Sequence, residues 1–254
     1  MARIISVHSF RGGTGKSNTV ANVAALLAAS GRRVGVVDTD IQSPGIHVLF
    51  GQRASDLPKT LNDFLWGRAA IAEAAYDVTP QTGTAPSGVA GRVFLIPSAA
   101  RTSEITRVLR EGYDARSLVA GLRDLNDQLK LDVLMIDTHP GINEETLLSI
   151  AMSHTLAVVM RPDAQDYEGT AITVEVARQL EVPNLMLVVN KAPAGLDPAA
   201  LQAQVEKTYD CPVAAVLPHS DELMALASHG LFVLRFPAHP ITALYQQITN
   251  RFMA

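Results

Sequence analysis

The chain has 254 residues, of which 48 % are hydrophobic and 18 % are charged, and its formal net charge is −4. This length and composition suit one α/β domain with a sizeable core. The charge gives no general indication of nucleic-acid binding, although a local basic patch is compatible with an acidic total. The single cysteine, Cys211, excludes an internal disulfide framework and a CxxC metal or cluster site. We find no signal peptide and no run of about 18 apolar residues, so we expect a cytoplasmic protein.

The first expected strand and helix flank a glycine-rich turn. Residues 3–7 predict a buried strand and residues 16–29 predict a helix. Glycines between them let backbone N–H groups converge on a phosphate chain, and the start of the helix directs its positive dipole there. The lysine adds a cation for the terminal phosphates, and the serine hydroxyl is a ligand for Mg²⁺. The predicted phosphate site consists of Gly12, Gly13, Thr14, Gly15, Lys16, Ser17 and Asn18.

Acidic residues follow two further buried strands. Residues 34–37 predict a strand that ends at Asp38 and Asp40, and residues 131–136 predict one that ends at Asp137. In open α/β sheets, ligands bind outside the carboxyl ends of the strands. An aspartate after an apolar strand in a P-loop protein is typically an anchor for Mg²⁺. His139 follows within the same turn, where both a hydrogen-bonded turn residue and a pH-sensitive contact are compatible with the sequence.

The rest of the chain continues the alternation of strands and helices. Further strands are expected at 93–96, 155–160, 184–189 and 212–217. Helices are expected at 60–65, 103–129 (as one or two helices), 144–153, 166–180, 197–208, 221–228 and 241–252, and a surface loop at 79–91. The pattern predicts an α/β fold with a mostly parallel twisted sheet of about seven or eight strands and helices on both faces, in one domain that spans residues 1–254.

The phosphate loop departs from the general P-loop pattern at Phe10, where the first glycine is expected. Residues 11–17 instead resemble the deviant P-loop of the MinD/ParA family of dimerising ATPases, in which a signature lysine stands at the position of Arg11. Residues 38–42 and 137–141 are similar to the two switch segments of that family. The resemblance implies a P-loop NTPase fold of the SIMIBI type, with ATP and Mg²⁺ as cofactors and a homodimer that forms on ATP binding.

The resemblance also implies roles for individual residues. Lys16 would hold the phosphates, Asp40 would orient the attacking water, and Arg11 would reach across the dimer to the partner's nucleotide. The Mg²⁺ site implied in this way comprises Ser17, Asp38 and Asp137.

The adenine site is expected at the ends of two later strands. By the same resemblance, Asn190 and Pro218 would lie beside the base. Pro193 stands where a GTPase carries the aspartate that pairs with guanine, so guanine specificity is not expected.

On this resemblance the protein is an ATP-dependent switch that hydrolyses ATP, slowly and under stimulation, to recruit or position an unidentified partner protein or cargo. One alternative is a nucleotide-binding regulatory sensor with little hydrolysis. Another is a metabolic P-loop ligase or kinase, which needs a substrate pocket that the sequence does not reveal.

Two regions of the sequence bear on binding to a membrane or to DNA. The expected C-terminal helix has one basic residue, Arg251, so no membrane-targeting helix is evident. Arginines between residues 101 and 123 alternate with acidic residues, which favours a solvated face over a DNA-binding one.

Overall fold

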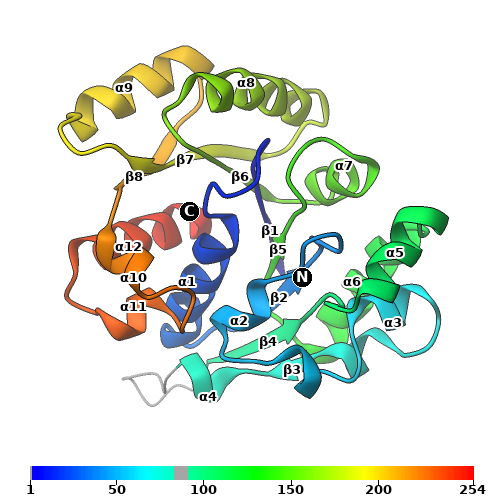
Figure 1. Ribbon diagram of the computed structural model, residues 1–254. Helices are drawn as coiled ribbons and strands as arrows, with labels where there is room; N and C mark the ends of the chain where they lie inside the picture. Colours follow the sequence, from blue (N-terminus) through cyan, green and yellow to red (C-terminus); the bar gives the residue numbers. More distant parts are fainter. Residues whose placement is uncertain (1, 83–90) are drawn as a thin grey trace.

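The computed structural model describes residues 2–82 and 91–254, which contain an eight-stranded sheet in the order β3-β4-β2-β5-β1-β6-β7-β8 (Figure 1). The strands are β1 (Arg3–His8), β2 (Arg33–Asp38), β3 (Tyr76–Asp77), β4 (Arg92–Ile96), β5 (Val133–Asp137), β6 (Thr155–Met160), β7 (Asn184–Ala192) and β8 (Val213–Pro218). All neighbouring strands run parallel except β3 and β4. The predicted mostly parallel α/β fold is therefore confirmed.

Helices connect the strands. They are α1 (Lys16–Ala29), α2 (Ile46–Leu49), α3 (Leu61–Leu65), α4 (Thr79–Thr82), α5 (Thr102–Glu111), α6 (Ala115–Leu129), α7 (Glu144–Ala151), α8 (Ala164–Gln179), α9 (Pro198–Tyr209), α10 (Asp221–Ala225), α11 (Phe232–Arg235) and α12 (Pro240–Met253). Two short 3₁₀ helices, η1 (Ala54–Asp56) and η2 (Ile71–Ala74), follow α2 and α3. Within the described ranges, no helix has the length and apolar character needed to cross a bilayer.

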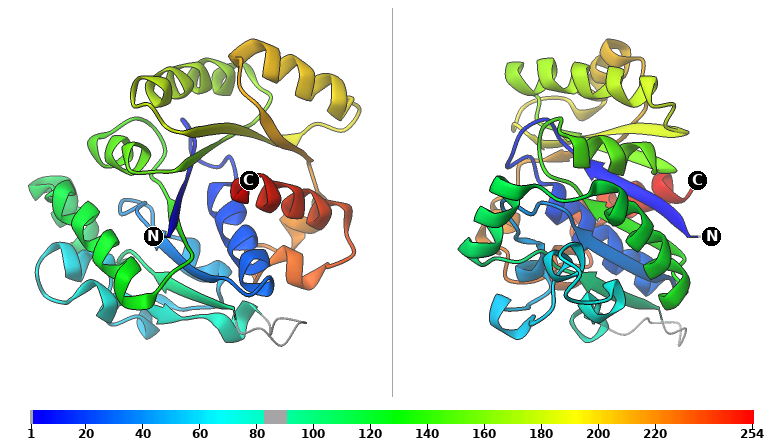
Figure 2. Two further views of the ribbon diagram at one scale, coloured as in Figure 1. Left: turned by 180° about the vertical axis from the view of Figure 1, so that it is seen from behind. Right: turned by 90° about the vertical axis from the view of Figure 1, so that its right-hand side faces the viewer.

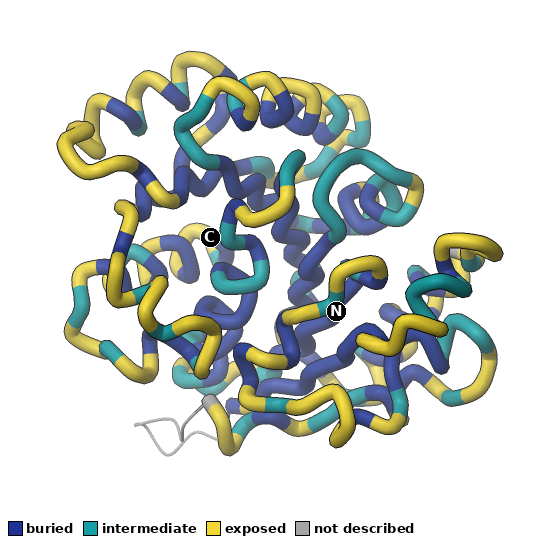
Figure 3. Tube along the Cα trace, viewed as in Figure 1, coloured by how far each residue is buried: buried dark blue, intermediate teal, exposed yellow. Residues whose placement is uncertain are grey.

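Successive residues of the central strands point to opposite faces of the sheet, and both faces are covered. Val133 and Met135 of β5 pack into a core with α1, α11 and α12, whereas Leu134 and Ile136 pack into a second core with α3 and α6. A third core lies between β6, β7, β8 and helices α8 and α9. Figure 2 shows the helices on either side of the twisted sheet, and Figure 3 shows that burial is concentrated along the strands. This burial on both faces explains why the strands are almost continuously apolar.

The structure decides between one and two helices for residues 103–129 and changes two other expectations. The segment 103–129 forms two helices, because α5 ends at Glu111 and the carboxylate of Asp114 caps α6 by accepting the N–H of Arg116. Residues 79–82 of the expected loop are helical, and the rest of that prediction, residues 83–90, lies outside the described residues. The helix expected at 221–228 ends at Ala225.

Candidate functional site

The glycine-rich turn joins β1 to α1 and is held in place from the end of β7. The Nδ2 atom of Asn190 donates to the carbonyl of Thr14 at 2.7 Å, and Nζ of Lys191 donates to the carbonyl of Gly13 at 2.7 Å. Gly15 has a φ of +105°, and a Cβ atom there would lie 2.2 Å from Nδ2 of Asn190. Only glycine fits at this position, because both the backbone conformation and the close approach exclude a side chain.

The start of α1 is open to an anion. Its N-cap residue is Gly15, and no side chain caps the helix. The N–H groups of the first turn and the positive end of the helix dipole therefore point out of the helix without a side-chain acceptor. Lys16 lies at the same end. It is 7 % exposed, and its Nζ donates to the Oγ atom of Ser9 at 3.1 Å. Burial lowers the pKa of Lys16, while nearby aspartates oppose this effect.

Two buried carboxylates lie side by side at the carboxyl ends of β2 and β5. Asp38 is paired in register with Asp137, and both side chains are buried. Burial raises the pKa of Asp38 well above its usual range, and repulsion from Asp137 and Asp40 adds to this. Burial also raises the pKa of Asp137 to about 6, opposed by a hydrogen bond from the Ser17 hydroxyl and by the charge of Lys16. The predicted clustering of the three aspartates beside the phosphate loop is therefore what the structure shows.

This cluster fits a magnesium ion. The Oδ1 atom of Asp137 is buried without a hydrogen-bond partner, although a buried carboxylate oxygen normally has one. Ser17 is near enough to Asp137 to lower its pKa, so a cation beside Ser17 would relieve the repulsion within the acidic cluster. In the described part of the chain, no three histidine, cysteine or acidic side chains form a metal cage by themselves. The usual ligands of Mg²⁺ are one or two carboxylates together with substrate phosphates and water.

A hydrogen bond joins the two segments that carry these aspartates. Nδ1 of His139 lies 2.7 Å from Oδ1 of Asp40, and the same oxygen accepts the N–H of Ser43 at 3.1 Å. His139 follows β5 and Asp40 follows β2, so the contact bridges residues 38–42 and 137–141. Of the two sequence interpretations of His139, the structure shows the hydrogen-bonded turn residue and identifies its partner; the pH-sensitive contact stays a prediction.

Arg11 points to the start of α8. Its Nη1 atom lies 3.2 Å from Oδ1 of Asp163 and 3.3 Å from Oδ1 of Asp166. Asp163 is the N-cap residue of α8, and Asp166 is 2 % exposed. Arg161 contacts both carboxylates as well, at 3.1 and 3.2 Å. Sequence reasoning did not identify Asp163, Asp166 or Lys191 as neighbours of the phosphate loop, because they lie more than 150 positions away from it.

Phe10 has a clear structural reason for its place in the loop. A Cβ atom at Gly169 would lie 2.2 Å from Cδ1 of Phe10, so the ring packs directly on the backbone of α8. The glycine inside α8, which lowers helix propensity, accommodates this side chain. The loop therefore rests on α8 through Phe10 and on β7 through Asn190.

The residues expected at the adenine lie at neighbouring strand ends. Asn190 is buried near the end of β7, and Pro218 is exposed at the end of β8, where it pairs with Ala192. Asn190 uses its amide on the loop carbonyl of Thr14 and on the N–H of Lys191. Asn18 is half-buried in α1, and its carbonyl accepts from the side chain of Asn22. Contact of Asn190 and Pro218 with a base stays a prediction.

Comparison with known proteins agrees with this geometry. Residues 5–233 match the family described as the CobQ/CobB/MinD/ParA nucleotide binding domain. The chain is 27 % identical to an uncharacterized ATP-binding protein of Methanocaldococcus jannaschii. The alignment covers all of this chain and 88 % of the relative.

Two solved structures share the fold. The septum site-determining protein MinD of Pyrococcus horikoshii, complexed with Mg-ADP, superposes with a TM-score of 0.79 and 22 % identity, over 98 % of this chain and 95 % of that one. A chain of the MinC:MinD cell division protein complex of Aquifex aeolicus gives a TM-score of 0.80 and 16 % identity, over 99 % of this chain and 96 % of that one.

Proposed function

Because the chain belongs to the CobQ/CobB/MinD/ParA nucleotide-binding domain family, we propose that it binds and slowly hydrolyses MgATP and forms an ATP-dependent homodimer that recruits a partner. The observation that carries this proposal is the uncapped start of α1 beside Lys16 and the paired carboxylates Asp38 and Asp137. A relative was solved with Mg-ADP and another with a protein partner, MinC, which supports the choice of ligand and the recruitment role. We further propose that residues 1–254 act as one ATPase domain.

The chain's own groups have separable tasks in this mechanism. The amides of the loop and the ammonium group of Lys16 hold the phosphates and neutralise their charge, which is the main requirement for phosphoryl transfer. Ser17, Asp38 and Asp137 would hold Mg²⁺ beside the phosphates. The bound metal supplies charge neutralisation at the phosphate oxygens.

Asp40 is the residue proposed to orient water. In the present structure its Oδ1 atom is engaged by His139 and by the N–H of Ser43. Orientation of an attacking water therefore requires at least one of these hydrogen bonds to be exchanged. This makes the two switch segments responsive to the terminal phosphate, since both segments meet at Asp40.

Arg11 is proposed to act across the dimer. Its guanidinium group offers a planar set of donors suited to phosphate oxygens. It is now bound to two carboxylates at the start of α8, and this competition favours slow hydrolysis in the isolated chain.

The test measures nucleotide binding and phosphate release for wild type, Lys16→Ala and Arg11→Ala, with mass in solution recorded with and without ATP. We expect Lys16→Ala to lose MgATP affinity by about tenfold or more, because one charge-assisted contact and the charge balance of the cluster are lost. We expect Arg11→Ala to keep nucleotide binding and to lose the ATP-dependent dimer.

The outcomes separate the alternatives. Binding without measurable turnover, under all conditions and with candidate partners present, would identify a nucleotide sensor. An ATP-dependent dimer that persists in Arg11→Ala would exclude the proposed role of Arg11. Absence of MgATP and MgADP binding in the wild type would overturn the proposed function.

A further inference from the structure

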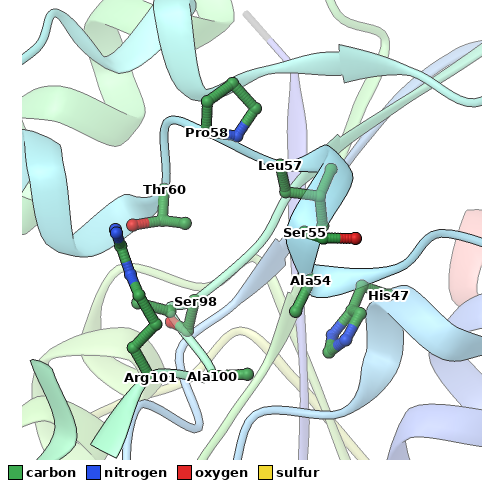
Figure 4. Close-up of a pocket in the computed structure, with 10 residues that line it drawn as sticks. His47, Ala54, Ser55, Leu57, Pro58, Thr60, Ser98, Ala100 and Arg101 are labelled. Atoms are coloured by element: carbon green, nitrogen blue, oxygen red, sulfur yellow. The ribbon is translucent and has the colours of Figure 1, made fainter. Parts of the chain in front are cut away.

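A cavity separate from the phosphate loop lies on the carboxyl side of β4, between α2, η1 and the start of α5 (Figure 4). Its volume is about 420 Å³, which lies within the range of small-molecule sites. None of the residues assigned to the phosphate site lines it. The buried part of its wall includes His47, Leu57 and Ala99, and the exposed rim includes Ala54 and Arg101.

His47 is a buried polar group that the protein itself leaves unsatisfied. The residue is 6 % exposed, and its Nδ1 atom has no hydrogen-bond partner. Neither ring nitrogen makes a hydrogen bond within the described part of the chain. Burial lowers the pKa of His47, so the ring is neutral at physiological pH and offers one donor and one acceptor. Nδ1 is sealed from any water-sized molecule, whereas Nε2 is not among the sealed atoms, so Nε2 is the ring nitrogen that a ligand in the cavity would reach.

Arg101 provides a cation at the opposite side of the cavity, as Figure 4 shows. Its side chain is exposed and takes part in no ion pair among the described residues. Arg101 is also the N-cap residue of α5, which no side chain caps. The first intrahelical hydrogen bonds come from the N–H groups of Glu104 and Ile105. The N–H groups of the two preceding residues therefore have no partner in the helix and point toward the end where Arg101 lies. An unpaired guanidinium and an open helix start together favour an anion.

The remaining polar groups of the wall are already used. The hydroxyl of Ser98 donates to the carbonyl of Asp38 at 2.7 Å, and that of Thr60 donates to the carboxylate of Asp63 at 2.8 Å. The rest of the lining is mostly apolar and includes Leu57, Pro58 and Ala99. A ligand that satisfies this cavity therefore carries an anionic group at one end, a short apolar stretch and a hydrogen-bonding group at the other end.

We propose that this cavity binds a small organic carboxylate, with the carboxylate at Arg101 and the start of α5 and the opposite end hydrogen-bonded to His47. The same chemistry is present in a free carboxylic acid and in the C-terminal end of a polypeptide.

The cavity is connected to the phosphate site through Asp38. Ser98, on one wall, donates to the backbone carbonyl of Asp38. The N–H of Gly45, the N-cap residue of the helix that carries His47, donates to Oδ2 of Asp38 at 3.3 Å. Both walls are thus bonded to one residue of the acidic cluster, and we infer that nucleotide and carboxylate alter each other's affinity. By linkage the two effects are equal in size. This coupling rests on the proposed function, whereas binding of the carboxylate does not.

Calorimetric titration of the nucleotide-free protein tests the site. The probes are glutarate and its diamide glutaramide, and N-acetyl-Ala-Leu as the free acid and as the amide. We expect saturable binding of at least one acid and about tenfold weaker binding of its amide, because the charge-assisted contact is lost. The tighter of the two acids identifies the source of the natural carboxylate. If neither acid binds saturably, or if acid and amide bind equally, the proposal is wrong.

Single substitutions test whether the acid binds in this cavity. Arg101→Gln is expected to weaken binding of the acid about tenfold, whereas Arg110→Gln, an exposed arginine of the same helix, leaves it unchanged. His47→Phe is expected to weaken it several-fold while the melting temperature stays close to wild type. An unchanged affinity in Arg101→Gln would place the ligand elsewhere and overturn the assignment.

A repeat titration with MgADP present tests the coupling, and a several-fold change in affinity for the acid is expected. If the affinity for the acid is unchanged although a melting shift verifies MgADP binding, the two sites are not coupled, and the carboxylate site itself still stands. A protein that binds the acid but not MgADP would overturn the proposed function alone.

Discussion

The Nη1 atom of Arg11 lies 3.3 Å from Oδ1 of Asp166, a carboxylate that is only 2 % exposed at the start of α8. Asp166 also accepts the backbone N–H of Arg161 at 2.8 Å, so its position is fixed by the strand end that precedes it. An arginine held in this way is not free to reach a second molecule. Dimerisation that uses Arg11 must therefore break an intramolecular ion pair first.

Asp163→Asn is expected to ease dimerisation. The amide oxygen of asparagine retains the cap on α8, whereas the charge that attracts Arg11 is lost. Half-exposed ion pairs contribute about 0.2–1 kcal/mol, so the ATP concentration for half-maximal dimer should fall by up to roughly fivefold. Light scattering across an ATP titration measures this. Glu111→Gln, which removes a comparable pair with Arg107, is the matched control and should change nothing. A higher ATP requirement in Asp163→Asn would contradict the competition.

Gly169→Ala is expected to destabilise the protein despite the higher helix propensity of alanine. The added Cβ would lie 2.2 Å from Cδ1 and 2.7 Å from Cβ of Phe10, so more than the end of a side chain has to move. Overpacking of this kind costs roughly 1–3 kcal/mol, which outweighs the gain of about 1 kcal/mol from replacing glycine in a helix. Chemical denaturation measures the difference. In a Phe10→Ala background the clash is absent, so the same substitution should be neutral or stabilising; equal losses in both backgrounds would disprove the contact.

His8 makes stability depend on pH. Its Nδ1 atom lies 2.7 Å from Oγ1 of Thr138, and burial, followed by the charges of Lys16 and His139, lowers its pKa from 6.5 to about 3. Between these values the unfolded chain binds a proton that the folded protein does not, so stability falls as pH falls below about 6.5. From pH 7 to pH 5 the wild type should lose about 2 kcal/mol relative to His8→Asn.

Urea denaturation of wild type and His8→Asn at several pH values measures this loss. The comparison of the two proteins cancels contributions from other titrating groups that both share. A difference in unfolding free energy that does not change with pH would show that His8 does not remain neutral in the folded state.

Cys211 is expected to be unreactive in the folded protein. It is buried, its Sγ lies 3.6 Å from the carbonyl oxygen of Leu185, and burial raises the pKa of the thiol to about 11. The thiolate is the reactive form, so modification by Ellman's reagent at pH 8 should be about 100-fold slower than in urea-unfolded protein. Comparable rates in the two states would show that the thiol is accessible.

The strands and the phosphate loop were predictable because their signals are local. Buried strands such as Val133–Asp137 are continuous apolar runs, and the loop combines glycines, lysine and serine within a few positions. The two-residue strand β3 carries no such signal, since it is too short for a periodic pattern. The partners of Arg11 lie 152 and 155 positions away, and Gly169 is explained only by Phe10 across the fold. Such pairs arise from topology, which a local pattern does not contain.

The two hydrogen bonds from the end of β7 to the phosphate loop have a further consequence. Asn190 and Lys191 each donate a hydrogen bond to a loop carbonyl at 2.7 Å. A cradle that is rigid beforehand gives up little conformational entropy on association, so fast capture and enthalpic binding are expected in calorimetry.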